Sequence, residues 1–229
     1  MKNITYFFIF KKIMKDIEKS EIKYKLIVIG DENVGKTSII NRLKKNQFTG
    51  DYEPTVGLDF QSMPIYIDEQ NITLLLYDTA GQEKYRSLIP LYTKDAHIIL
   101  LIYDISNYNS FTNIEKWYDS LSNVNKEEVI FILVGNKIDL VEERQVKEEE
   151  GKKYADDHNF IFQEMSALTG DGTKELLMDK LLSQIRTHLL NKVKLNQDQE
   201  EEQLKLKLQG SSEKILKNQK KKKCCCCPK

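Results

Sequence analysis

The sequence predicts an α/β fold in which a mostly parallel, six-stranded sheet carries helices on both faces. Short apolar runs alternate along the chain with segments of helical periodicity, as strand–helix–strand units require. Two of the runs, AHIILLIYD (96–104) and VIFILVGNK (129–137), are apolar almost throughout, which is typical of strands buried on both faces. Ligands bind such sheets at the carboxyl ends of the strands, so we expect the functional residues there.

Each element is predicted from the spacing of its apolar residues. The strands are expected at 24–30, 60–67, 72–78, 96–104, 129–137 and 159–167. The helices are expected at 36–46, 109–121, 146–158 and 173–190. The second and third strands flank the polar turn DEQN and should pair with each other. Pro64 places the second strand at an edge of the sheet, because proline cannot donate to a strand ladder.

One globular domain is expected between two tails. The chain of 229 residues has room for one sizeable domain, which we assign to residues 23–190. Residues 1–22 read as a disordered N-terminal extension, since their apolar stretch is too short for a membrane span and lacks the cleavage site of a signal peptide. Residues 191–229 are highly charged and contain no aromatic residue, which predicts a flexible tail.

Charge and cysteine usage exclude several functional classes. The formal net charge is +0, and a basic run is confined to the C-terminal tail, which argues against nucleic-acid binding by the globular part. All 4 cysteines are consecutive, at 224–227, so they cannot form a disulfide framework. The 3 histidines are scattered singly, so the spaced ligands of a zinc site are not predicted.

The stretch GDENVGKTS, residues 30–38, lies between the first strand and the first helix. It matches G-x-x-x-x-G-K-[ST], in which a glycine-rich loop wraps backbone N–H groups around phosphates at a helix N-terminus. We expect Lys36 to reach the β- and γ-phosphates and the Thr37 hydroxyl to bind Mg²⁺. The nucleotide-binding residues predicted in this loop are Asn33, Val34, Gly35, Lys36, Thr37 and Ser38.

An acidic residue ends the third strand in the sequence LLLYDTAGQ, residues 74–82. This is the Walker B arrangement, so Asp78 is expected to hold Mg²⁺ directly or through water. Gly81 offers a backbone N–H to the γ-phosphate, and Gln82 is placed to orient an attacking water. Taken alone, Asp78 also fits a helix cap or a turn.

Two further motifs at strand ends point to guanine. NKID (136–139) ends the fifth strand, and SAL (166–168) follows the sixth. The Asp139 carboxylate can accept the paired N–H donors of guanine, which adenine does not supply. The residues predicted to surround the base are Asn136, Lys137, Asp139, Ser166, Ala167 and Leu168.

Three of these residues have specific expected roles. The Asn136 amide should bond the base and hold its loop, the Lys137 stem should cover the ring, and the Ala167 N–H should meet the guanine carbonyl. NKID alone also fits a plain surface turn. The surface-turn interpretation is less favoured because four motifs occur in order, each at the end of a strand.

The motifs together resemble the Ras superfamily of small GTPases from about residue 24 to 190, and within it the Rab branch. YEPTVGLDF (52–60) resembles the Rab first switch, and DTAGQEKYRSLIPLY (78–92) resembles the second. RSLIPLY, SFTNIEKW and RQVKEEEG are most similar to the Golgi-trafficking subgroup. The resemblance implies a P-loop small G-protein fold, GTP or GDP as ligand, Mg²⁺ as cofactor, and GTP hydrolysis that releases two switch loops.

The resemblance also implies roles for residues outside the four motifs. Thr55 would close onto Mg²⁺ and the γ-phosphate, and would join Lys36 and Gln82 in the catalytic set. Phe48 would pack on the guanine. An effector surface would comprise Phe60, Tyr77 and Tyr92, although core packing accounts for these aromatics equally well. Two positions depart from the family: Tyr77 stands where Trp is usual, and Leu168 replaces the Lys of SAK.

The C-terminus CCPK resembles the ends of doubly prenylated Rab proteins, with lipids on Cys226 and Cys227. Four preceding lysines, 220–223, would add attraction to an anionic leaflet. We therefore expect the protein on the cytoplasmic face of endomembranes, with the Golgi favoured, and in a cytosolic pool. An unmodified basic tail that aids solubility is the alternative.

The partners implied are an exchange factor, a GTPase-activating protein, a GDP dissociation inhibitor, the prenylation escort machinery and effector proteins. Two other functions fit parts of the pattern. A nucleotide-locked binding module would share the fold with negligible GTP hydrolysis. Five intact residues argue against it: Lys36, Thr37, Thr55, Asp78 and Gln82. An ATP-using P-loop enzyme is opposed by Asp139 and by the lack of a substrate or lid domain.

Overall fold

The computed structural model describes the globular region apart from short gaps. The described residues are 22–48, 55, 57–68, 70–81 and 87–191. The predictions for Gln82, Cys226, Cys227 and most of both tails lie outside them. The chain divides into two units, Met1–Leu182 and Ser183–Lys229, and of the second unit residues 183–191 are described and are helical.

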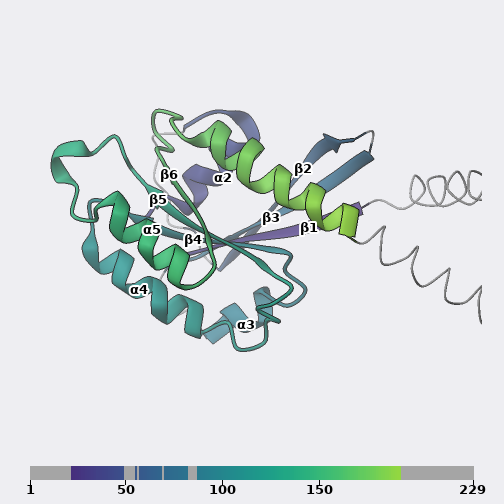
Figure 1. Ribbon diagram of the computed structural model, residues 1–229, viewed down its shortest axis with the longest axis horizontal. Helices are drawn as coiled ribbons and strands as arrows, with labels where there is room; N and C mark the ends of the chain where they lie inside the picture. The colour runs from purple at the N-terminus through teal and green to yellow at the C-terminus, as the bar shows by residue number, and fades with distance from the viewer. Residues whose placement is uncertain (1–21, 49–54, 56, 69, 82–86, 192–229) are drawn as a thin grey trace, which may run out of the picture. The chain divides into compact units, whose positions relative to one another are not determined.

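Among the described residues of the first unit, strands alternate with helices except that β3 follows β2 directly (Figure 1). Its strands are β1 (Ile22–Ile29), β2 (Leu58–Ile67), β3 (Gln70–Thr79), β4 (Ile98–Asp104), β5 (Ile130–Asn136) and β6 (Ile161–Met165). Its helices are α2 (Lys36–Lys45), α3 (Ile89–Tyr92), α4 (Tyr108–Asp119), the 3₁₀ turn η2 (Val141–Glu143), α5 (Glu148–Asp157) and the π-helical segment η3 (Glu175–Leu182).

All six strands form one sheet in the order β2-β3-β1-β4-β5-β6. The pair β2–β3 is antiparallel and the other neighbours are parallel, which confirms the predicted fold class. Pro64 lies in β2, which is an edge strand of the sheet, as predicted. Every residue of β4 is buried, as the continuous apolar run predicted.

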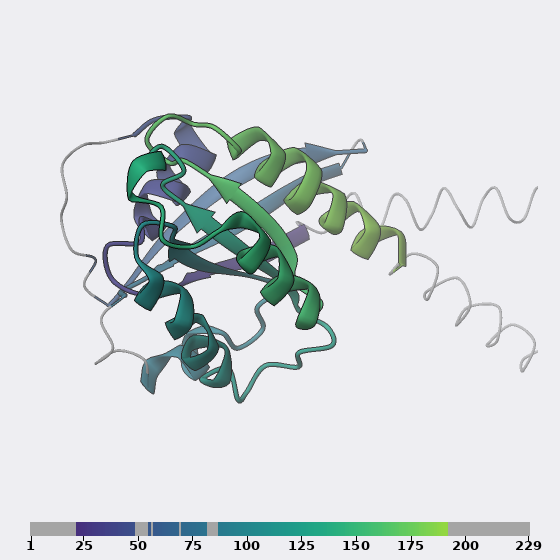
Figure 2. The same cartoon turned by 60° about the vertical axis from the view of Figure 1, so that its left-hand side comes forward.

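Helices cover both faces of the sheet (Figures 1 and 2). On one face, Ile114 and Trp117 of α4 and Ala155 of α5 join alternate strand residues in a single core cluster. On the other face α2 packs through Ile39, Ile40 and Leu43, all of them buried. Burial on both faces explains why the central strands carry almost no polar residue before their carboxyl ends.

The segment that follows β6 differs from the expected α-helix. Residues of η3 form π turns, in which the hydrogen bonds join positions five apart. Its two fully buried residues, Leu176 and Leu181, are themselves five apart, so the wider turn brings both to the same face. The sequence analysis predicted a helix here correctly, but it did not predict the wider π turns. Among the described residues, no helix has the length and apolar character needed to cross a bilayer.

A tight contact between β4 and α5 fixes the spacing of these elements. Tyr103 is fully buried, its hydroxyl has no hydrogen-bond partner within the described chain, and burial raises its pKa. A Cβ on Gly151 of α5 would collide with that hydroxyl and would lie 2.8 Å from a ring carbon of Phe162. Glycine at this helical position is therefore required by packing.

Gly151→Ala is expected to lower the unfolding free energy, measured by urea denaturation. In a helix, alanine is more favourable than glycine by about 1 kcal/mol. Forcing its methyl group against Tyr103 and Phe162 costs about 1–3 kcal/mol, which outweighs that gain. Tyr103→Phe removes the unpaired hydroxyl and should leave the protein as stable or more stable by about 1 kcal/mol. The double variant should recover part of the loss. A stabilising Gly151→Ala would contradict the packing argument, and Lys152→Ala on the exposed face of α5 is the control.

Candidate functional site

Polar residues gather where the parallel strands end. Four of the parallel strands carry a polar residue at or just after the carboxyl end, and all four of these residues are buried. These residues are Asp78 in β3, Asp104 in β4, Asn136 in β5 and Ser166 after β6.

The predicted phosphate loop connects β1 to α2. Helix α2 begins at Lys36, directly after Gly35, whose φ of 94° lies in the left-handed region that favours glycine. A Cβ on Gly35 would also collide with the side-chain amide nitrogen of Asn136. Val34 is buried, Asn33 is exposed and Ser38 is half-buried in the first turn of α2. The loop thus brings its backbone to a helix N-terminus, where an anion is favoured.

Lys36 is a buried cation held against the loop itself. Lys36 is the first residue of α2, and its side-chain ammonium donates to the carbonyls of Gly30 at 3.0 Å and Asp31 at 2.5 Å. The residue is 5% exposed, and burial lowers its pKa to about 8 despite the nearby carboxylate of Asp78. Both acceptors of the ammonium are neutral carbonyls, so an anionic ligand would be favoured beside it.

Gly81 approaches the phosphate loop so closely that no side chain fits there. A Cβ at this position would collide with the ammonium of Lys36 and with the carbonyl of Asp31. The loop after β3 therefore crosses directly beside the lysine, as a backbone group that contacts the same phosphate must.

Thr37, Thr55 and Asp78 come together although they are far apart in sequence. The Thr37 hydroxyl donates to Asp78 Oδ2 at 2.5 Å and lies 2.9 Å from the Thr55 hydroxyl. Thr55 also reaches Asp78 Oδ2, at 3.4 Å. Asp78 is 2% exposed, and burial raises its pKa, although the Thr37 hydrogen bond and the Lys36 charge oppose the shift.

This group of oxygens fits a magnesium ion. Asp78 Oδ1 is buried and has no hydrogen-bond partner within the described chain, so a carboxylate oxygen is available beside two hydroxyls. Mg²⁺ is typically held by one or two protein carboxylates together with substrate phosphates and waters. Among the described residues, no group of three or more His, Cys, Asp or Glu gathers as a dedicated metal cage. The donor set therefore matches a metal that is shared with a phosphate ligand.

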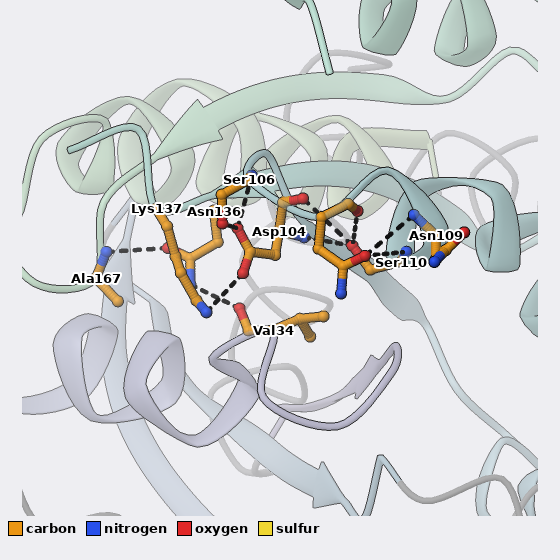
Figure 3. A network of polar contacts seen from close by, with 9 residues as sticks. Val34, Asp104, Ser106, Asn109, Ser110, Asn136, Lys137 and Ala167 are labelled. Atoms are coloured by element: carbon orange, nitrogen blue, oxygen red, sulfur yellow. Dashed lines mark hydrogen bonds and ion pairs between the residues drawn. The ribbon is translucent and has the colours of Figure 1, made fainter. Parts of the chain in front are cut away.

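Asn136 connects the phosphate loop to the loop after β6 (Figure 3). Its amide nitrogen donates to the Val34 carbonyl at 2.8 Å, and its amide oxygen accepts from the Ala167 N–H at 3.1 Å. Both ends of this 1%-exposed side chain are thus engaged within the protein. The Ala167 N–H, which we expected to meet guanine, is bonded here to Asn136, and its contact with the base stays a prediction.

Lys137 forms an ion pair that the sequence analysis did not foresee. Its ammonium lies 2.6 Å from Asp104 Oδ2, and Asp104 Oδ1 accepts from the N–H and the hydroxyl of Ser106 (Figure 3). The signal was present, because Asp104 ends an apolar strand as Asp78 does. Since the φ of Lys137 is 70°, its backbone turns sharply at the end of β5, and the ion pair fixes where its stem lies.

Asp139 is half-buried and oriented by Ser166, whose hydroxyl donates to Asp139 Oδ1 at 2.5 Å. Arg42 of α2 supports the same region by donating to the carbonyls of Ala167 at 2.9 Å and Leu168 at 2.6 Å. Arg42 was not predicted, because its partners lie more than 120 residues away in the chain. Leu168 itself is 52% exposed.

The aromatic residues assigned to an effector surface divide into two kinds. Phe60 on β2 is 51% exposed, and its ring lies 5.1 Å from that of Tyr77, its partner across the β2–β3 ladder. Tyr77 and Tyr92 are partly buried and pack against the core cluster. Phe48, expected at the base, is exposed just before a gap in the described chain.

A sequence model of the Ras family matches residues 25–187 of the chain. The match covers more than half of the chain, including all of the strand-end residues described above. The sheet with its one antiparallel edge pair, the loop around Lys36 and the oxygens around Asp78 agree with a P-loop nucleotide-binding fold. On this match, and with this fold, the chain belongs to the Ras family of small GTPases.

Proposed function

We propose that this Ras-family GTPase is a Rab-type switch that regulates vesicle traffic, with Golgi-associated transport as its process. Membership of the family means that the protein binds guanine nucleotides and hydrolyses GTP, under the control of regulators and effectors. The finer assignment is supported by the two switch-like segments and by the segments similar to the Golgi subgroup. Phe60 is exposed and its ring lies edge-on to the ring of Tyr77, which supplies an aromatic surface of the kind that effectors bind.

The observation that carries the nucleotide assignment is the convergence of complementary groups on one edge of the sheet. The buried ammonium of Lys36 suits phosphate, the Thr37–Thr55–Asp78 oxygens suit Mg²⁺, and the Asp139 carboxylate suits the guanine edge. When bound there by Thr37, Thr55 and Asp78, Mg²⁺ would neutralise charge on the phosphates.

The chain's own residues position the reactants and supply little covalent chemistry. We assign Lys36 to the charge on the β- and γ-phosphate oxygens, and Gln82, outside the described residues, to the attacking water. Arg42 and Arg144 are both engaged elsewhere, with loop carbonyls and with Glu164. An arginine supplied by an activating protein adds about 10³–10⁵ in rate, so we propose slow intrinsic hydrolysis and a timer that partners control.

Asp139→Asn is expected to weaken GDP binding by at least about a hundredfold, because two charge-assisted hydrogen bonds to guanine are lost. Xanthosine diphosphate should bind the variant better than GDP does, since xanthine carries an acceptor where guanine carries its amine. Competition against a fluorescent nucleotide measures both. Asp156→Asn, on the exposed part of α5, is the matched control and should change neither affinity. A variant that keeps its preference for guanine would contradict the contact assigned to Asp139.

The tail prediction concerns membrane attachment. The full-length chain should fractionate with Golgi membranes, whereas a chain ending at Lys223 should be found in the cytosol, because two lipid chains are needed for stable anchoring. A chain with Lys220–Lys223 changed to Gln should stay lipid-modified but bind anionic vesicles less tightly. Imaging with compartment markers and mass spectrometry of the C-terminal peptide give the readouts. Membrane binding that survives the truncation, or unmodified cysteines, would contradict the lipid anchor, and a different compartment would contradict the Golgi assignment.

A further inference from the structure

Asp31, the second residue of the phosphate loop, is tied to helix α4 through both of its carboxylate oxygens. Oδ1 accepts from the indole N–H of Trp117 at 2.7 Å, and Oδ2 accepts from the amide of Asn113, also at 2.7 Å. The residues are 82 and 86 positions apart in the chain, so the contact joins two separate elements. Both bonds are charge-assisted, and such bonds are about twice as strong as neutral ones.

The partners of the Asp31 carboxylate are themselves fixed. Trp117, a residue of α4, is fully buried in the core cluster. The amide oxygen of Asn113 accepts from Lys116 at 2.8 Å, which turns the amide nitrogen toward Asp31. Both partners offer only donors to Asp31, and each bonds a different oxygen, so a carboxylate satisfies both at once. An amide in its place would present its own NH2 donors to one of them. The tether therefore ties the start of the phosphate loop to a rigid part of the core.

The backbone of the same residue faces the nucleotide site. The Asp31 carbonyl accepts from the Lys36 ammonium at 2.5 Å, and it is the group that Gly81 passes so closely. A rotation of the Asp31 peptide would displace the ammonium and the crossing of the Gly81 loop together. The side chain and the carbonyl of one residue thus connect helix α4 to the charge that faces the phosphates.

We propose that Asp31 is a positioning residue for the phosphate-binding lysine. By anchoring the loop to Trp117 and Asn113, the carboxylate holds the Asp31 carbonyl, and with it Lys36, in the geometry that retains the nucleotide phosphates. The inference rests on the assignment of Lys36 to the phosphates under the proposed function. It adds helix α4 to the elements that set the rate of nucleotide release.

The test compares GDP release from the full chain and its variants. Release of a fluorescent GDP into excess GDP in magnesium buffer should be about tenfold faster for Asp31→Ala, because the variant loses at least one charged hydrogen bond. Asp31→Asn can still accept from Trp117 and should lie between Asp31→Ala and the unchanged protein. Asn113→Ala should accelerate release by a smaller factor. The double variant Asp31→Ala/Asn113→Ala should match Asp31→Ala, because both changes act through one carboxylate.

Two further readouts separate positioning from a general loss of stability. Trp117 is the only tryptophan of the chain, so its emission should change in both Asp31 variants and not in the control Asn109→Ala, an exposed asparagine on the same helix. Melting temperatures in saturating GDP identify variants that are merely unstable. If Asp31→Ala does not fold, Asp31→Asn and Asn113→Ala decide by the same comparison.

Release rates within twofold of the unchanged protein in every folded variant would overturn the inference, whatever the melting temperatures. That result leaves the proposed function intact, because the unchanged chain still binds GDP. Failure of the unchanged chain to bind GDP would instead remove the proposed function itself.

Discussion

The side-chain amide of Asn136 holds together the two loops on which the nucleotide site depends. It donates to Val34 in the phosphate loop and accepts from Ala167 in the loop after β6. An amide buried to 1% exposure with both ends satisfied is stable only in one orientation, since a flipped amide would face like groups. The position of Asn136 therefore sets the distance between the phosphate-binding and base-binding regions, and Gly35 must lack a side chain to let it pass.

The site also holds charge that the fold does not fully compensate. Lys36 and Asp78 are nearly inaccessible to solvent. Within the described chain, the Lys36 ammonium donates to two neutral carbonyls, and one oxygen of Asp78 has no hydrogen-bond partner. Burial lowers the pKa of Lys36 and raises the pKa of Asp78, and each shift favours the neutral form of the side chain. Such an arrangement costs stability in the free protein and favours a ligand that brings phosphate and a divalent cation together. The Asp31 carboxylate, by contrast, has a donor at each oxygen and connects this site to helix α4.

Much of the fold followed from local patterns in the sequence. Continuous apolar runs predicted β4 and β5, Pro64 predicted the edge strand, and the G-x-x-x-x-G-K-T spacing brought Lys36 to the start of a helix. The contacts that orient the site were not predictable in this way. Asp31 and Arg42 each bond to residues more than 80 positions away, and nothing in their own neighbourhood signals those partners. The π turns of η3 were also missed, because the usual templates test shorter helical periods.

The most direct test of this account is the nucleotide content of the purified full-length chain. Protein isolated and washed in magnesium buffer, then denatured and analysed by ion-exchange chromatography, should release guanine nucleotide in an amount equal to the protein. A wash with EDTA should remove most of it, since the oxygens around Asp78 would lose their metal. Protein that retains no guanine nucleotide in magnesium, or from which ADP displaces bound nucleotide as well as GDP does, would contradict the account.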